Sequence, residues 1–192
     1  MKYFHLLVAA LILLFVFTGC NSTASNGNNS NGNGGNSKQG RSNQPTTKEP
    51  TWGVRNKTSN CTINGPLQDI ACTPGDIIQS ATKEQICQPG YARTVRNVPT
   101  SEKNQVYAEY GITHHSTGEY EVDHLVSLEL GGSNDISNLW PEAASPKPGF
   151  HEKDKVENYL HDQVCSGAVS LKQAQIEIAT NWLDVYNRMP SK

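Results

Sequence analysis

Residues able to perform acid–base and metal chemistry are concentrated between positions 114 and 161. Five of the six histidines lie there: His114, His115, His124, His151 and His161. Asp123 directly precedes His124, and Asp154 follows His151 by three positions. A neutral imidazole can accept a proton near physiological pH, whereas carboxylate, amide and imidazole groups can hold a divalent cation. This stretch is therefore the candidate site for acid–base or metal chemistry.

The segments around these residues predict an α+β fold. Residues 120–125 are strand-like, Gly131-Gly132 begins a loop, and residues 138–140 form a second extended run. Residues 151–164 predict a helix, because apolar residues recur there at intervals of four. Further helices are expected over residues 100–110 and after Ser170, where the last helix carries an apolar stripe.

The order strand, loop, extended segment, helix is the layout of a ββα-metal nuclease site. The run from Asp123 to Pro141 reads D-H-L-V-S-L-E-L-G-G-S-N-D-I-S-N-L-W-P. It resembles the HNH endonucleases and, within them, a small exported bacterial subgroup with this signature. The resemblance covers roughly residues 60–187, and includes Cys72-Thr-Pro-Gly75 upstream and Lys153-Asp154 downstream.

The resemblance implies a role for each of the central residues. Asp123 would be a metal ligand, His124 the general base, and Asn138 the residue whose side chain bonds the backbone and orients that base. The ligand from the helix stays open between His151 and Asp154, with Glu157 one turn further on. Asp123 and His124 alternate along a strand, so their side chains should begin on opposite faces.

The expected activity is metal-dependent hydrolysis of phosphodiester bonds in DNA, with RNA as a second candidate substrate. Mg²⁺ or Mn²⁺ suits an oxygen-rich site, while a histidine-rich version would admit Zn²⁺. Arg96, Lys153 and Lys155 are the expected nucleic-acid contacts. No base-reading module is visible, so little sequence specificity is expected from what we take to be a monomer. The alternative is a catalytically inactive domain of the same fold that binds nucleic acid or a partner.

The N-terminus predicts export. Residues 1–20 have the form of a signal peptide, with Lys2 before a short apolar run. Phe17-Thr18-Gly19-Cys20 resembles the lipobox of bacterial lipoproteins, so we expect Cys20 to be lipidated and to anchor the protein on the outer side of a membrane. Ordinary secretion without a lipid is the alternative.

A tether and one domain should follow. Residues 21–57 predict a disordered linker, rich in Asn, Ser and Gly at its start, and residues 58–192 the folded domain. The net charge of −2 is unevenly divided, because ten basic and seventeen acidic residues lie from Cys61 onward. A broad basic surface is therefore excluded, and nucleic acid would have to bind at a local site.

The remaining four cysteines are an even number in an exported domain, which predicts two disulfides. Three pairings are possible, and we favour Cys61 with Cys72 and Cys87 with Cys165. A zinc site made of all four thiolates is less favoured, because no pair has the short CxxC spacing.

Overall fold

A computed structural model of the protein describes residues 48–190. The predicted signal peptide, the lipobox with Cys20, and the linker up to residue 47 lie outside the described residues. Within residues 48–190, no helix is both long enough and apolar enough to span a membrane.

The contacts of the folded domain begin before residue 58, our predicted boundary. Arg55 donates from Nε to the carbonyl oxygen of Cys72 at 2.7 Å, and its guanidinium pairs with Glu109. Lys57 donates from Nζ to Asp69 at 2.9 Å. Trp52 of the same segment also packs against the hydrophobic core. Residues 48–57 otherwise carry few apolar side chains, and much of the segment is held by polar contacts that a hydrophobic pattern does not indicate.

The described chain is α+β, with one two-stranded antiparallel sheet among helices. The elements are α1 (Lys83–Ile86), α2 (Tyr91–Val95), α3 (Thr100–Glu109), β1 (Tyr120–His124), the short 3-10 turns η1 (Leu128–Leu130) and η2 (Ile136–Asn138), β2 (Leu139–Ala143), α4 (Phe150–Ser166) and α5 (Leu171–Arg188). The sequence predicted the five longer elements to within a few residues. It did not predict α1 and α2, whose single turns are too short for a hydrophobic period.

The two faces of the β1–β2 hairpin carry different side chains. Asp123 pairs with Trp140, and His124 pairs with Leu139. Because side chains alternate along a strand and paired residues share a face, Asp123 and Trp140 lie on one face and His124 and Leu139 on the other.

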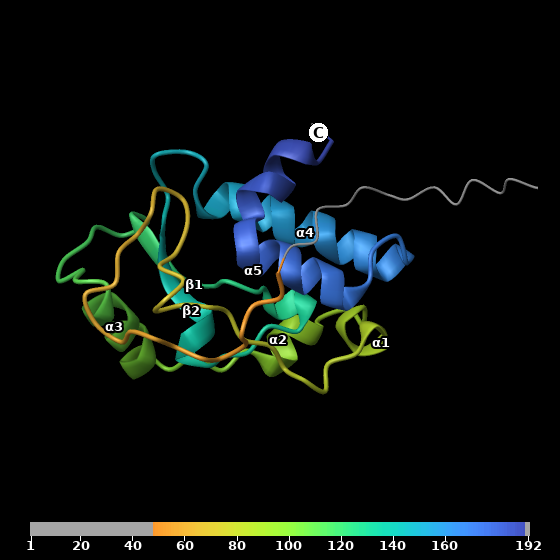
Figure 1. Ribbon diagram of the computed structural model, residues 1–192, viewed down its shortest axis with the longest axis horizontal. Coiled ribbons are helices and arrows are strands. Elements are labelled where there is room, and N and C mark those ends of the chain that lie inside the picture. The colour runs from red at the N-terminus through yellow and green to blue at the C-terminus, as the bar shows by residue number, and fades with distance from the viewer. Residues whose placement is uncertain (1–47, 191–192) are drawn as a thin grey trace, which may run out of the picture. The chain divides into compact units, whose positions relative to one another are not determined.

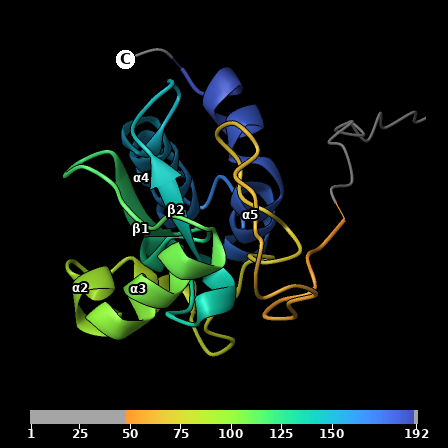
Figure 2. The ribbon, with the colours of Figure 1, turned by 90° about the vertical axis from the view of Figure 1, so that its left-hand side faces the viewer.

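Helices α4 and α5 lie side by side and both contact η1, while α3 packs against both strands of the hairpin (Figures 1 and 2). Helix α4 begins at Gly149, where the carboxylate of Glu152 accepts from the glycine N–H at 3.0 Å, and it ends at Gly167. The predicted apolar stripes are buried, and with the hairpin they form the core: Leu125, Leu130, Leu139, Trp140, Val156, Leu160, Val164, Ala174, Ile178, Trp182 and Val185. Helix α5 departs from helical geometry at Asn181.

Two disulfides join Cys61 to Cys72 and Cys87 to Cys165, as favoured from the sequence. The second links the end of α1 to the last turn of α4 across a sequence separation of 78 residues. Since all four thiols are bonded in pairs, a four-thiolate zinc site does not form. The disulfides indicate an oxidising, extracytoplasmic environment.

Candidate active site

The face of β1 that meets α4 holds a group of buried charges. Lys153 of α4 is 0% exposed, and its Nζ donates to Asp123 Oδ2 at 2.7 Å and to the backbone oxygen of His124 at 2.8 Å. The same ammonium group also pairs with Glu157, one turn further along α4. One lysine therefore joins the two carboxylates and the end of β1 to the helix.

These groups shift one another's pKa values. Burial alone would raise the pKa of Asp123, but the charge and hydrogen bond of Lys153 outweigh it and lower that pKa. Burial raises the pKa of Glu157 to about 7, although Lys153 opposes the rise. Burial would lower the pKa of Lys153, and the surrounding carboxylates raise it instead. Lys153 is therefore protonated and Asp123 ionised at neutral pH.

Glu142 of β2 adds a fourth member to this group. Its side chain is fully buried, with Oε2 4.0 Å from Lys153 Nζ. Burial raises the pKa of Glu142 to about 10, with the charge of Asp123 adding to the rise and Lys153 opposing it. The carboxyl group is therefore neutral at pH 7.

His124 lies on the opposite face among amide groups. It is 2% exposed, and its Nε2 lies 3.2 Å from Asn134 Oδ1. The orientation of the Asn134 amide is fixed independently, since Nδ2 donates to Val95 O at 2.7 Å and Oδ1 accepts from Asn97 N at 3.0 Å. Nε2 must therefore carry the hydrogen, which leaves the lone pair of the neutral ring on Nδ1.

The ring of His124 is neutral at physiological pH. Burial lowers the pKa of His124 to about 4, against the raising effects of Asp123 and Asn134. The charges of Arg96 and Lys153 contribute to this lowering of the pKa. A neutral imidazole is the form that can accept a proton from water.

Asn138 holds the backbone that follows His124. Its Oδ1 accepts from Val126 N at 2.9 Å, and its Nδ2 donates to Val126 O at 3.0 Å and to Ser133 O at 2.8 Å. Close approach of the loop explains the glycine at 132, because a Cβ there would lie 1.8 Å from Val126 O. Asn138 contacts backbone, as the resemblance implied, and Asn134 is the residue that contacts the ring of His124.

A polar cleft of ≈ 560 Å³ runs along β1. Arg96, Lys103 and Tyr107, from the end of α2 and from α3, line one wall, and Asp154 and Glu157 of α4 line the other. Residues 120–123 of β1 lie between them. His124 does not line this cleft, although its neighbours Asp123 and Arg96 do.

The three predicted metal ligands do not all lie in the cleft. Asp123 and Asp154 both line the cleft, and the pKa of Asp154 is raised by burial and then by the charge of Asp123. His151 is exposed, and its ring packs against Phe150 with centroids 4.3 Å apart. Glu121 is a cleft carboxylate that we had not selected, although its position two residues before Asp123 puts it on the same face.

The three residues predicted to contact the substrate also differ in exposure and position. Arg96 is exposed and lines the cleft. The side chain of Lys155 is 59% exposed and lies 3.5 Å from Glu152. Lys153 is fully buried with its ammonium group engaged by Asp123 and Glu157, so our expectation of a surface contact with nucleic acid does not fit its position.

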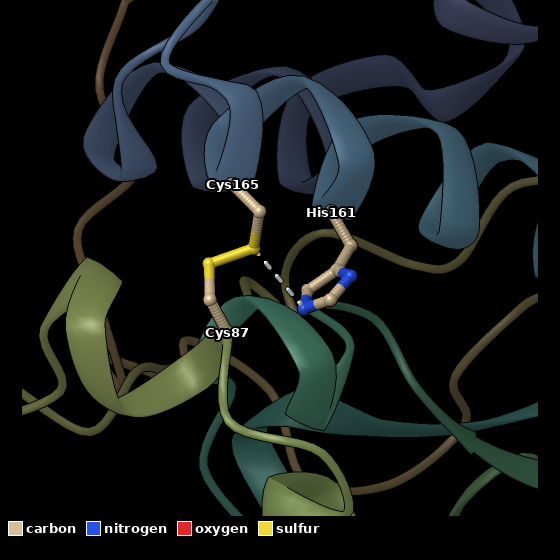
Figure 3. Close-up of side chains that lie close together, drawn as sticks. All are labelled: Cys87, His161 and Cys165. Carbon is tan, nitrogen blue, oxygen red and sulfur yellow. Dashed lines mark hydrogen bonds between the residues drawn. A yellow bond between two sulfur atoms is a disulfide. The ribbon is translucent and has the colours of Figure 1, made fainter.

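A second cluster with metal-binding residue types lies at the disulfide between α1 and α4 (Figure 3). Among the described residues, Cys87, His161 and Cys165 are the one group whose potential ligand atoms all lie within 4.8 Å of one another. His161 Nε2 lies 3.1 Å from Ile86 O and 3.5 Å from Cys165 Sγ. Both sulfurs are in the disulfide and offer no thiolate to a metal ion. His161 therefore packs beside a disulfide here.

Comparisons of the chain with family models, with curated proteins and with solved structures gave no match. The functional argument therefore rests on the side-chain geometry and on the residues of the motif.

Proposed function

We propose that this protein is an exported, metal-dependent endonuclease of the HNH type that hydrolyses phosphodiester bonds with little sequence specificity. DNA is the proposed substrate, and RNA is a second candidate. The observation that carries the proposal is the pair at the end of β1. His124 is neutral, with a fixed tautomer, and lies directly beside Asp123, whose carboxylate opens on a cleft that also contains Arg96.

His124 is the proposed general base. Nε2 is held by Asn134, so Nδ1 would take the proton from the attacking water. Because His124 is almost fully buried, this role requires the side chains over the ring to open when substrate binds. Arg96 is exposed in the cleft and near His124, and it would bind the phosphate. Its movement toward the phosphate would then accompany the opening over the His124 ring.

The oxygen donors that line the cleft suit a hard divalent cation, Mg²⁺ or Mn²⁺, although the three carboxylates do not all lie within 4.8 Å of one another and would have to close on the ion. Asp123 and Asp154 would hold it, with Glu121 as a further oxygen donor. Burial and mutual repulsion raise the pKa values of Glu121 and Asp154, and positive charge at this place would relieve that repulsion. A bound cation would supply charge to the phosphate and to the departing oxygen. Lys153 engages Oδ2 of Asp123, so Oδ1 would be the oxygen that binds the cation.

Export and lipid anchoring at Cys20 are part of the same proposal. The disulfides support an extracytoplasmic location, and the lipobox-like sequence supports membrane attachment.

The test is cleavage of supercoiled plasmid by the purified protein in Mg²⁺ or Mn²⁺, with and without chelator. His124→Ala should lower the rate by about a hundredfold or more, because the base is lost. His114→Ala, an exposed histidine of the loop before β1, is the control and should cleave like wild type. Cleavage unchanged in chelator, or in a folded His124→Ala variant, would refute this mechanism. Binding without cleavage by the wild type would favour the inactive, nucleic-acid-binding alternative.

A further inference from the structure

Three aromatic rings gather at one edge of the cleft. The rings of Tyr107 in α3 and His115 are tilted by 32° with centroids 4.4 Å apart, and His115 meets Tyr120 of β1 edge-on at 6.3 Å. His115 is exposed, and Tyr107 and Tyr120 are partly exposed. His115 Nδ1 lies 3.2 Å from Ser116 O, which fixes the plane of the ring.

The cleft beside these rings also carries two cations. Tyr107 and Tyr120 line it together with Arg96 and Lys103. Lys103 and Tyr107 are four residues apart in α3, so they lie on one face of that helix. A flat ring bound at Tyr107 would therefore have a positive charge one helical turn away, on the side opposite the carboxylates of α4.

We propose that this surface, formed by the rings of Tyr107, His115 and Tyr120 at the edge of the cleft and by Arg96 and Lys103 in its lining, binds an unpaired nucleotide of single-stranded nucleic acid. The base stacks on the aromatic cluster, and its phosphate pairs with Arg96 and Lys103. The inference deepens the proposed function, on which it rests for the class of polymer, and it specifies the preferred form of that polymer.

Two physical arguments favour a single strand. Aromatic side chains stack on base faces, and those faces are covered by neighbouring pairs in a duplex but free in a single strand. Where no cation neutralises them, the carboxylates Glu121, Asp123 and Asp154 repel phosphate, so the part of the backbone away from the cation is favoured along the side that carries Arg96 and Lys103. The aromatic rings lie along that path.

The experiment measures binding, so it does not depend on cleavage. The full-length chain carrying His124→Ala is titrated, in Ca²⁺ and again in chelator, with a labelled oligothymidylate and with an abasic oligomer of equal length. We expect the abasic oligomer to bind about tenfold more weakly, since it keeps the phosphates but lacks the stacking base. A hairpin duplex should also bind less tightly than the single strand.

The variants assign the preference to the cluster. His115→Ala and Tyr107→Leu should reduce oligothymidylate binding to the abasic level, whereas Tyr107→Phe, which keeps the ring, and His114→Ala should retain the preference. Arg96→Gln with Lys103→Gln should weaken both oligomers alike. Equal binding of the two oligomers by the parent chain, or equal effects of His115→Ala and His114→Ala, would overturn the inference. Failure of the wild type to cleave would instead refute the proposed endonuclease and leave this binding result standing.

Discussion

Asp123 and His124 are consecutive residues of β1, and their side chains lie in opposite electrostatic environments. Asp123 faces Lys153, Glu157 and the neutral carboxyl of Glu142. On this side the ammonium group of Lys153 is paired with carboxylates. His124 faces Asn134, and the loop behind it is held by the neutral amide of Asn138. Strand alternation alone produces this separation, because it sends neighbouring side chains to opposite faces.

The difference shows how one short strand can keep a carboxylate ionised and an imidazole neutral. On the charged side, the ammonium group of Lys153 lowers the pKa of Asp123. On the amide side, burial without a strong acidic hydrogen-bond partner lowers the pKa of His124 to about 4. Both residues are thereby in the deprotonated form at neutral pH, as a ligand and a base would need.

The strongest test of the charged side is Lys153→Met, which keeps the length of the side chain and removes its charge. Asp123 and Glu157 would lose their shared counter-ion in a buried place, so the free energy of unfolding at pH 7 should fall by about 3–5 kcal/mol. Unfolding in urea measures this loss of free energy. Lys155→Met, two positions along α4 and largely exposed, should cost within about 0.5 kcal/mol. Similar losses in the two variants would mean that the buried ion group contributes nothing special.

The amide side is tested by Asn138→Ala. The change leaves Val126 and Ser133 with unpaired backbone groups, and should lower the free energy of unfolding by about 2–3 kcal/mol. Asn158→Ala is the matched control, because Asn158 is exposed on α4 and bonds only its own helix. If the Asn138 variant unfolds at the same urea concentration as the control, the loop is held by something other than this amide.

Some of this arrangement could be read from the sequence, because it follows from local rules. Alternation predicted that Asp123 and His124 separate, and the interval of four predicted the buried stripe of α4. The even number of cysteines predicted two disulfides, although it left three pairings open, and the cap at Ser170 was likewise predictable.

The contacts between distant segments could not be read in this way. In the sequence, Lys153 cannot be distinguished from a solvated lysine on a helix surface. Only the folded structure shows that its side chain points at β1. Glu142 follows Trp140 by two positions, so alternation indicated its face but not its complete burial. The contact of Asn134 with His124 depends on a loop closed by Val95 and Asn97, far away in sequence.

The neutral state of Glu142 is tested by the pH dependence of stability. Its pKa is about 10 in the folded protein against an ordinary value of 4.5, so between these values the folded state holds a proton that the unfolded state releases. Stability contributed by this group is therefore present at low pH and is lost as pH rises. Glu142→Gln cannot titrate, so its advantage over wild type should grow from about pH 5 to about pH 9 in urea unfolding. A constant difference over this range would show that Glu142 is ionised in the folded protein.

The smallest expected effect concerns the metal ligand from α4, which is either Asp154 or His151. Asp154 lines the cleft with Asp123, whereas the ring of His151 is exposed and packs on Phe150. We therefore expect Asp154→Asn to weaken Mn²⁺ binding about tenfold in calorimetry, and His151→Ala to change it little. A neutral imidazole ligand would also make affinity fall between about pH 7 and 5.5, and His151→Ala would remove that fall. A larger loss in His151→Ala, accompanied by this pH signature in the wild type, would mean that the helix turns His151 toward Asp123 when the cation binds.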